Sequence, residues 1–518
     1  MRDDIDYVPT NRFVLWGHHF TSVAGAAPII GPGIAVIWGW LPAFLWVVLG
    51  TIFFAGVHDF GAVWASVRHK ARSLGSLTGD VISVRARSLF MVVIFFVLLM
   101  VNAVFAVAIS DAFQATPSSV IPAWSAVFVA IIIGALIYRM HVGLMWPTIV
   151  GTVILYAVIY LGELVPVELP ATVVSLPPSA QWIVLLFVYA AIASMLPVWL
   201  LLQPRDYING IQLFVGLGIL YGAVLIASPM IVAPAINQNM PAAAPPIVPL
   251  LFVTIACGAI SGFHGLVGSG TTSKQLNTEP DARFVGYLGS SGEGALAIVA
   301  IIAATAGFAS LSEWETMYSS FGAGGMTAFV QGGAVVVNNG LGLSISFAET
   351  LLTVMAVLFA GTTMDTGVRL QRYIVQEMGT IYNIPPLQNG YTATAIAVGA
   401  CLALAFGAGG SDGSGGMLIW PLFGTTNQLL AGLTLLVISV ILVKLGRPAR
   451  YTLTPMIFVT SMAFLSAVYQ LWDLYATGQY FLVVVDIMII ITAVMVMLES
   501  VSAFMRERRN AAAVTPTG

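Results

Sequence analysis

The stretch 17–33, GHHFTSVAGAAPIIGPG, lies inside the first long apolar segment of the chain and decides how the other segments are interpreted. A segment that crosses a membrane is normally an unbroken helix, because unpaired backbone N–H and C=O groups are costly in hydrocarbon. Pro28 and Pro32 each remove a backbone donor and clash with the preceding turn, and Gly25 weakens the helix further. We therefore predict a functional break in this segment near Gly25.

The composition indicates a membrane protein. Of the 518 residues, 59% are hydrophobic and only 8% are charged, whereas a soluble globular protein carries about 25% charged residues. Apolar runs recur from end to end, and about 20 such residues cross roughly 30 Å of hydrocarbon as a helix. The predicted fold class is an all-α polytopic membrane protein with about fourteen transmembrane helices, near 14–38, 43–66, 88–110, 122–138, 144–163, 181–203, 211–231, 248–269, 285–309, 345–367, 392–408, 418–443, 452–473 and 481–503.

The distribution of basic residues supports this order of spans. All 19 Lys and Arg residues fall at the N-terminus, in the even-numbered gaps between spans or in the C-terminal tail. Because Lys and Arg accumulate on the cytoplasmic side, both termini are predicted to be cytoplasmic. The expected location is the cell inner membrane, where the basic residues would form a collar beside anionic lipid.

A second proline-containing span has the right position for an inverted repeat. Span six, 181–203, is interrupted by Pro197 and ends at Pro204. Spans one and six are five apart and would run in opposite directions, as in transporters whose discontinuous helices form the substrate site. We predict a transport core over 1–369 with repeats at 14–163 and 181–367, four further helices over 370–505, and a disordered cytoplasmic tail over 506–518. The external gap 310–344 is expected to hold a short helix at the surface.

Ionisable side chains inside spans indicate function, because they are costly in a membrane. They share the cytoplasmic part of five spans: His18, His19, His58, Asp59, His264, Glu293 and Asp365. Three interpretations of the histidines stay open: a proton relay, a metal site, or hydrogen-bonded residues at the membrane interface. Adjacent histidines on one helix point about 100° apart, so His18 and His19 alone are a poor chelate. No bound metal or cofactor is predicted.

Four motifs resemble the carbon starvation protein A family: DYVPTNRFVLWGHHFTSVAGAAPIIGPG (6–33), LPVWLLLQPRDYI (196–208), TIACGAISGFHGLVGSGTTSKQL (254–276) and WPLFGTTNQLLAGL (420–433). The resemblance runs in order across nearly the whole chain. It implies membership of the amino acid–polyamine–organocation superfamily, with a leucine-transporter-like inverted repeat of five plus five helices. It also implies proton-coupled secondary uptake of small carboxylate-bearing nutrients such as pyruvate, or of peptides.

By analogy with that superfamily, the resemblance also implies site residues. The substrate would lie between the two breaks, at Gly25, Ala26, Ala27 and Pro28 from span one and Leu196, Pro197 and Trp199 from span six. A cation site would lie near Ala24, Ser261 and His264. Together with His18, His19, His58 and Asp59, these last residues are the predicted coupling-ion or proton-relay set.

The predicted function is proton-coupled uptake of a small carboxylate such as pyruvate, without enzymatic activity and without a nucleic-acid partner. Amide groups at the N-terminus of a half-helix would bind the carboxylate. Amino acids or peptides are alternative substrates. Sodium coupling through Ser261 and the Thr271–Thr272 pair is the first rival. The second rival is a membrane-embedded metal-binding enzyme or sensor that uses His18, His19, His58 and His264.

Overall fold

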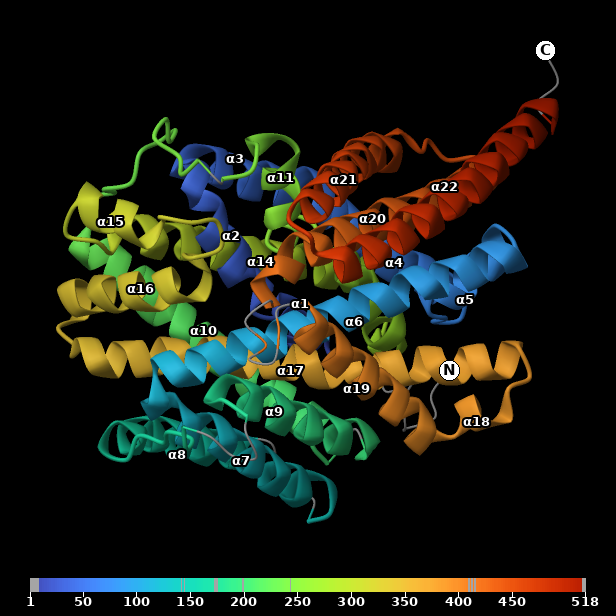
Figure 1. The fold of residues 1–518 in the computed structure, drawn as a ribbon. Helices are drawn as coiled ribbons and strands as arrows, with labels where there is room; N and C mark the ends of the chain where they lie inside the picture. The colour runs from blue at the N-terminus through green and yellow to red at the C-terminus, as the bar shows by residue number, and fades with distance from the viewer. Residues whose placement is uncertain are drawn as a thin grey trace.

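The computed structural model describes residues 9–140, 142–143, 145–171, 176–197, 200–242, 244–408, 410, 413 and 416–514. Within these ranges the chain forms helices and no strand, and one isolated bridge joins Thr10 to Leu276 (Figure 1). This agrees with the predicted all-α class. It follows from the long apolar runs, whose backbone groups find partners within a helix.

The helices of the first half are α1 (Arg12–Ala24), α2 (Ala27–Ala35), α3 (Trp40–Gly50), α4 (Gly56–Arg68), α5 (Leu74–Val81), α6 (Val84–Ala115), α7 (Val120–Tyr138), α8 (Met145–Leu164), α9 (Pro178–Met195) and α10 (Leu202–Ala227). Those of the second half are α11 (Ile247–Thr254), α12 (Gly262–Val267), α13 (Ser273–Gln275), α14 (Asp281–Ala306), α15 (Leu311–Met317), α16 (Gly325–Leu341), α17 (Ile345–Ile381), α18 (Pro385–Gln388), α19 (Gly390–Gly407), α20 (Gly416–Lys444), α21 (Arg450–Ala476) and α22 (Tyr480–Val514). Two π-helical stretches, Thr51–Ala55 and Gly268–Thr272, join α3 to α4 and α12 to α13.

Twelve helices in the described part of the chain are long and apolar enough to cross a membrane. The pair α1–α2, bent by 51°, adds a thirteenth if it is counted as one span. The predicted eighth span, 248–269, is not among them, because its halves α11 and α12 have only eight and six residues. The polytopic helical fold is confirmed, and the count of fourteen stays a prediction.

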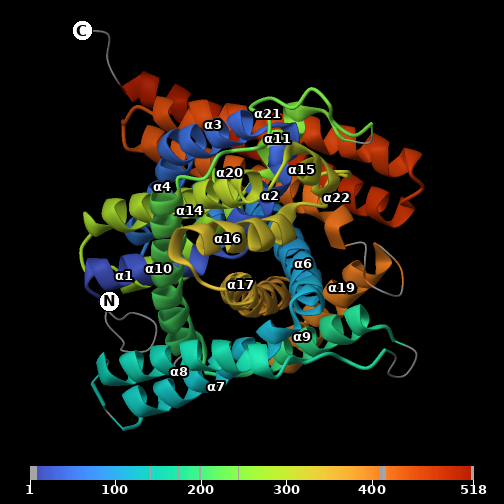
Figure 2. The same cartoon turned by 90° about the vertical axis from the view of Figure 1, so that its left-hand side faces the viewer.

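The longest helices form the interior. Figure 2 looks along α17, which lies among α6, α9, α10 and α16. The helices α7 and α8 form one outer edge and α21 and α22 the opposite one (Figures 1 and 2). The most apolar windows of α6 and α20 are 89% buried inside the protein, against 33% for α21 and α22. The helices α6 and α20 therefore lie inside the protein, whereas α21 and α22 are largely exposed at its edge.

Pro197 does not interrupt a span. The helix α9 ends at Met195, and α10 begins at Leu202, so Pro197 lies in the connection between two helices. Leu196 adopts an extended conformation, with φ −70° and ψ 150°, because a following proline disfavours the helical region. The prediction of a break inside span six was wrong at this position.

The segment 310–344 contains the expected short surface helix, α15, whose side chains are mostly exposed, and also a longer helix inside the protein. Its helix α16 has 17 residues and packs against α10, α14 and α17. Gly332 lies so close to the backbone of Ala303 and Gly307 that a Cβ atom would clash with the carbonyl oxygen of Ala303. Small residues that let two helices approach this closely favour burial. The burial of α16 was not predicted from the sequence.

The tail predicted to be disordered from residue 506 is helical through Val514, while 515–518 lie outside the described residues. Arg, Glu and Ala dominate the end of α22 and are good helix formers. Glu507 also lies 3.9 Å from the ammonium group of Lys444 on α20. Local propensity and this contact together extend the helix.

Candidate functional site

The predicted break at Gly25 is present. The helix α1 ends at Ala24 and α2 begins at Ala27. Gly25 has φ +33°, a conformation that L-residues rarely adopt. A Cβ atom at Gly25 would lie 2.7 Å from Oγ1 of Thr363 on α17. The N–H groups of Ala26 and Ala27 belong to the first turn of α2, where no preceding turn supplies carbonyl partners.

A second interruption lies between α11 and α12, over residues 255–261. Gly258 has φ +93° in its middle. Side chains from other helices compensate the lost helical hydrogen bonds: Thr51 donates to the Gly258 carbonyl at 2.9 Å, and Trp46 donates to the Ile255 carbonyl at 3.2 Å. This satisfies the requirement that irregular backbone in a membrane protein be enclosed by protein or water.

The two interruptions pack against each other. A Cβ atom on Gly258 would lie 3.5 Å from Cβ of Pro28, and one on Gly31 would lie 2.5 Å from the Thr254 carbonyl oxygen. The partner of the first broken span is therefore α11–α12, the predicted eighth span, and not the segment around Pro197. Since the two spans are seven apart, their chain directions are still opposite.

A buried network of histidines and carboxylates lies next to the second break. Nδ1 of His264 on α12 is 2.8 Å from Oδ2 of Asp59 on α4, and Nδ1 of His58 is 2.7 Å from the other oxygen of Asp59. Nε2 of His264 lies 2.9 Å from Oε2 of Glu293 on α14. All four side chains are at most 2% exposed. The sulfur atom of Cys257, which belongs to the second break, lies within 4.8 Å of a ring nitrogen of His264 and a carboxylate oxygen of Glu293, so the break lies next to the network.

The geometry of His264 sets the number of protons in this network. Each ring nitrogen faces a carboxylate oxygen, but a neutral imidazole carries only one N–H. Both contacts are favourable only if the ring is doubly protonated or one carboxyl group holds the proton. Oε1 of Glu293, Nε2 of His58 and Nε2 of His264 have no hydrogen-bond partner among the described residues, so the 2.9 Å contact between His264 and Glu293 is an electrostatic one. The network can therefore accept and release a proton while the charged groups of His264, Asp59 and Glu293 stay next to one another.

The other predicted relay residues lie in separate contacts. His19 bonds Oγ1 of Thr272 at 2.8 Å, whereas His18 lies 3.9 Å from Asp206 on α10. The two remaining members are fully buried. Ala24 ends α1, and Ser261 precedes α12 and accepts a hydrogen bond from the Asn427 amide at 3.0 Å. The structure thus joins His58, Asp59 and His264 directly and leaves His18 and His19 outside that hydrogen-bonded group.

The predicted span-six residues lie apart from the broken helices. The Leu196 carbonyl accepts a hydrogen bond from Arg369, and Leu196 packs in a different apolar cluster from Ala26 and Ala27. No described hydrogen bond or ring contact joins Leu196 or Pro197 to the residues 25–28. Trp199 lies outside the described residues.

Three residues of this site were not predicted from the sequence. Glu293 was recognised as ionisable but was not placed in the relay, Gly258 was not singled out, and Asn427 was overlooked. Asn427 accepts from the Phe263 amide at 2.9 Å and so caps the start of α12. An amide side chain inside the apolar run 418–443 was the available signal, because buried polar groups need specific partners.

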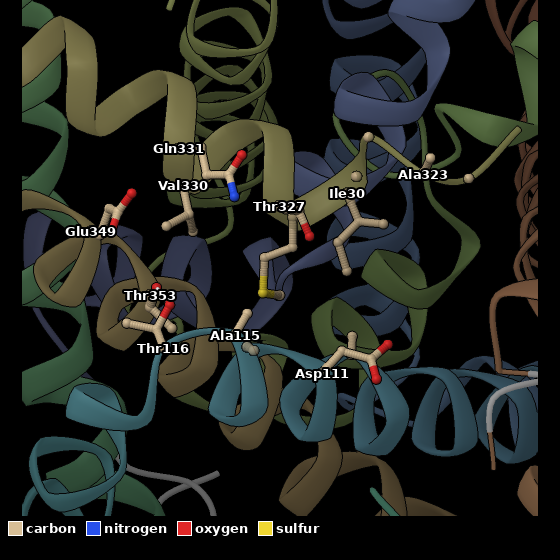
Figure 3. A pocket seen from close by; sticks show the side chains of 16 residues that line it. Ile30, Asp111, Ala115, Thr116, Ala323, Thr327, Val330, Gln331, Glu349 and Thr353 are labelled. Atoms are coloured by element: carbon tan, nitrogen blue, oxygen red, sulfur yellow. Dashed lines mark hydrogen bonds between the residues drawn. The ribbon is translucent and has the colours of Figure 1, made fainter. Parts of the chain in front are cut away.

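Two cavities flank the breaks. The first, of about 220 Å³, lies where α2, α6, α16 and α17 meet, and Asp111 and Glu349 face it from different helices (Figure 3). The second, of about 520 Å³, lies between α17 and the α12–α13 region and includes Thr366 and Arg369. On α17, Thr353 lines the first cavity and Thr366 lines the second. At 1.5 Å of rise per residue, the cavities are about 20 Å apart along this helix. Thr363, which contacts the Gly25 break, lies between them.

The donor atoms closest to a metal-site arrangement are those of Cys257, His264 and Glu293. All three residues are buried, and the donor atoms lie within 4.8 Å of one another. This set differs from the four histidines considered above, of which His58 and His264 both contact Asp59. The Cys257 thiol meanwhile donates to Ser261 at 3.2 Å.

Comparisons with known proteins identify related sequences and a similar fold. A sequence profile of the family described as Carbon starvation protein CstA matches residues 1–322 and 308–466. The "Peptide transporter CstA" of Campylobacter jejuni is 33% identical over 88% of this chain and 72% of its own length. The "Pyruvate/proton symporter BtsT" of Escherichia coli K12 is 30% identical over 86% of this chain and 72% of its own length. The crystal structure of a manganese transporter from Eremococcus coleocola shares the fold, with a TM-score of 0.57 at 12% identity, over 98% of this chain and 99% of that one.

Proposed function

The chain belongs to the carbon starvation protein CstA family, and on this premise we propose that it is a secondary transporter that takes up a small carboxylate-bearing nutrient together with protons. Pyruvate is the first candidate substrate. The observation that carries the proposal is the imidazole of His264, held between two buried carboxylates beside a broken helix.

The broken helix α1–α2 supports binding of a carboxylate. Backbone N–H groups at the start of a helix favour an anion, both as hydrogen-bond donors and through the helix dipole. In this chain these groups are those of Ala26 and Ala27, because Pro28 has no N–H. Gly25 gives the turn its conformation, and Thr363 contributes a buried hydroxyl without a partner among the described residues. The substrate carboxylate would replace these missing partners.

The network around Glu293 supports coupling to protons. A proton on Glu293 removes its negative charge beside Cys257, which precedes Gly258 in the second break. Gly258 in turn lies against Pro28 of the first break. Protonation of Glu293 can therefore shift the arrangement of the substrate-binding backbone through these contacts. A shift of this kind couples proton binding to substrate binding.

The sodium alternative has less support from the same contacts. The hydroxyl groups considered as sodium ligands are already engaged: Thr271 donates to the Val267 carbonyl, Thr272 bonds His19, and Ser261 bonds Asn427. A sodium ion prefers oxygen ligands that are free to surround it. Uptake measured with and without a sodium gradient separates the two coupling ions.

One observation favours amino acids or peptides as substrates. The cavity in Figure 3 presents the carboxylates of Asp111 and Glu349, with no Lys or Arg among its described lining residues. Such a cavity attracts an ammonium group more than a lone carboxylate. Competition of labelled pyruvate uptake by dipeptides and by acetylated dipeptides, which lack the ammonium group, distinguishes these substrates.

The orientation and the repeat boundaries belong to the same proposal. We infer that both termini are cytoplasmic, that the protein lies in the inner membrane, and that α1–α2 and α11–α12 are the symmetry-related broken spans of a transport core. The direct contact between the two breaks supports the last inference. The helices after residue 370 would then support the core without forming the substrate site.

The test is pyruvate uptake into proteoliposomes driven by an imposed proton gradient. His264→Ala should reduce proton-driven uptake by about tenfold or more, since general proton-transfer groups contribute roughly 10²–10⁴-fold where they act, while the protein stays folded. The matched control is His69→Ala, because His69 bonds only the local Ala65 carbonyl. Unchanged uptake by His264→Ala across the pH range would exclude His264 from the mechanism.

A further inference from the structure

The second cavity contains a buried arginine without a counter-ion. Arg369 on α17 is 7% exposed and lines the cavity of about 520 Å³ together with Thr366, and the same cavity is lined by Lys274 and Glu377. Among the described residues, no carboxylate lies within ion-pair distance of the Arg369 guanidinium group, and the buried Asp206 interacts with it only electrostatically, without a salt bridge. Removing a charge from water without an opposite charge is costly, so this arginine needs an explanation.

The hydrogen bonds of Arg369 use only part of its guanidinium group. Nη2 donates to the carbonyl oxygens of Ala193 at 2.7 Å and Leu196 at 2.8 Å, at the C-terminal end of α9. Nε is buried and has no partner in the described part of the chain. A guanidinium group has five N–H donors in a fixed fork. The carbonyls therefore hold the group in place and leave donors available for a further acceptor.

Arg369 continues a polar face of α17 that begins at the first break. Thr363, Thr366 and Arg369 are spaced by three residues, so they lie along one side of the helix. Thr363 contacts Gly25 at the break, while Thr366 and Arg369 line the cavity. Hydrogen-bonding groups thus extend from the half-helix site into the cavity, on the side that the basic residues mark as cytoplasmic.

We propose that this cavity is an exit subsite, in which Arg369 and the Thr366 hydroxyl hold the carboxylate of the substrate after it leaves the broken helices. The inference rests on the proposed function, because it needs a carboxylate as cargo. A carboxylate provides the counter-charge that Arg369 lacks and accepts charge-assisted hydrogen bonds from it. The cavity in Figure 3 presents two carboxylates, whose charge is opposite to that of Arg369. The proposed subsite therefore acts only on the cytoplasmic side.

The first experiment compares transport from the two faces of the membrane. In right-side-out and inside-out vesicles, Arg369→Gln should raise the half-saturation concentration of pyruvate by about tenfold from the cytoplasmic face and by less than about twofold from the external face. Thr366→Val should shift it in the same direction, and Thr366→Ser should restore it. The matched control is Arg372→Gln: Arg372 is 8% exposed on the same helix but is not among the residues that line the cavity.

A second measurement does not require any arginine variant to fold. A cysteine at Tyr373, which lines the cavity and is 45% exposed, is labelled with a maleimide in inside-out vesicles. Pyruvate should slow this labelling, and the uncharged ester methyl pyruvate should not.

The outcomes separate the two proposals. If Arg369→Gln raises the half-saturation equally from both faces, or only lowers thermal stability, Arg369 is a cap of α9 and the exit subsite is wrong. Labelling of Tyr373→Cys that pyruvate does not slow, in a protein that transports pyruvate, also overturns the subsite. If the unaltered protein carries no carboxylate from either face, the proposed function itself fails.

Discussion

At the scale of single residues, Gly258 connects the parts of the site. Its carbonyl accepts a hydrogen bond from Thr51, and a Cβ atom built on it would lie 3.5 Å from Cβ of Pro28. Its φ of +93° is accessible to glycine but strained for any residue with a Cβ atom. Gly258 therefore connects the two helix breaks and follows Cys257, which lies beside the proton network, and it has no side chain that could have indicated this role.

Gly258→Ala tests this connection. A Cβ atom would lie 2.8 Å from Cβ of Ala297, and the positive φ adds strain of about 1–3 kcal/mol. We expect a lower melting temperature in detergent and reduced proton-driven uptake.

The control for this variant is Gly222→Ala in α10, where no neighbouring atom lies within 4 Å of the added Cβ. Alanine inside a helix is favoured over glycine by about 1 kcal/mol, so this variant should keep or raise the melting temperature. Equal shifts for both variants would show that Gly258 has no special role.

At the scale of elements, a buried ion pair fastens α10 to α17. Arg205 and Asp365 form a close salt bridge, each 3% exposed, and Tyr189 of α9 donates to the same carboxylate oxygen at 2.8 Å. Arg205 was predicted to lie with the other basic residues in a cytoplasmic collar beside lipid. The structure buries it between helices instead. Asp365 therefore pairs across helices, and Arg369, one turn further on α17, is left for the cavity.

Breaking this pair should cost much more than breaking a surface pair. Arg205→Gln leaves a buried carboxylate without its partner, a loss of about 3–5 kcal/mol in comparable cases, and should clearly lower the melting temperature. The double variant with Arg205→Met and Asp365→Leu should recover most of the loss, because apolar replacement of both partners is often neutral.

The surface pair for comparison is Arg85 with Glu499, whose side chains are 76% and 31% exposed. Exposed pairs contribute about 0–1 kcal/mol, so Arg85→Gln should change the melting temperature little. A double variant as unstable as Arg205→Gln would contradict the ion-pair explanation.

At the scale of the whole molecule, the two broken spans lie between two cavities of opposite character. The carboxylates of Asp111 and Glu349 mark one cavity, and the guanidinium of Arg369 marks the other. The interior helices α6, α17 and α20 hold this arrangement, with α7–α8 and α21–α22 at the edges (Figure 1). A buried centre that encloses a pair of broken helices is the construction that alternating access requires.

Cysteine labelling in intact cells tests the orientation of the whole molecule. A membrane-impermeant maleimide should label Ala323→Cys in the cavity of Figure 3 and should not label Tyr373→Cys in the other cavity. The natural Cys257 and Cys401 are 5% and 0% exposed, so the unaltered chain serves as the unlabelled background. Labelling of Tyr373→Cys alone would reverse the predicted topology.

Much of the architecture could be predicted from the sequence, because it depends on local chemistry. Apolar runs long enough to cross a bilayer require helices, and Gly25 with the nearby prolines requires an interruption between α1 and α2. The resemblance of four long motifs indicated the family correctly. The second break was harder to recognise, since prolines stand out in a sequence while Gly258 lies in a segment rich in small residues. Pro197 was chosen for its visible chemistry, although a proline after a helix C-terminus commonly ends the helix.

The sequence by itself determined that the chain is helical, that it crosses a membrane, and that its first span is broken at Gly25, since these properties depend on side chains close together in the chain. Only the tertiary structure decided which segment faces that break, that His264 lies between Asp59 and Glu293, and that Arg369 is left without a counter-ion. Such pairings join residues up to hundreds of positions apart. They depend on how the helices pack in three dimensions, and no local pattern records that packing.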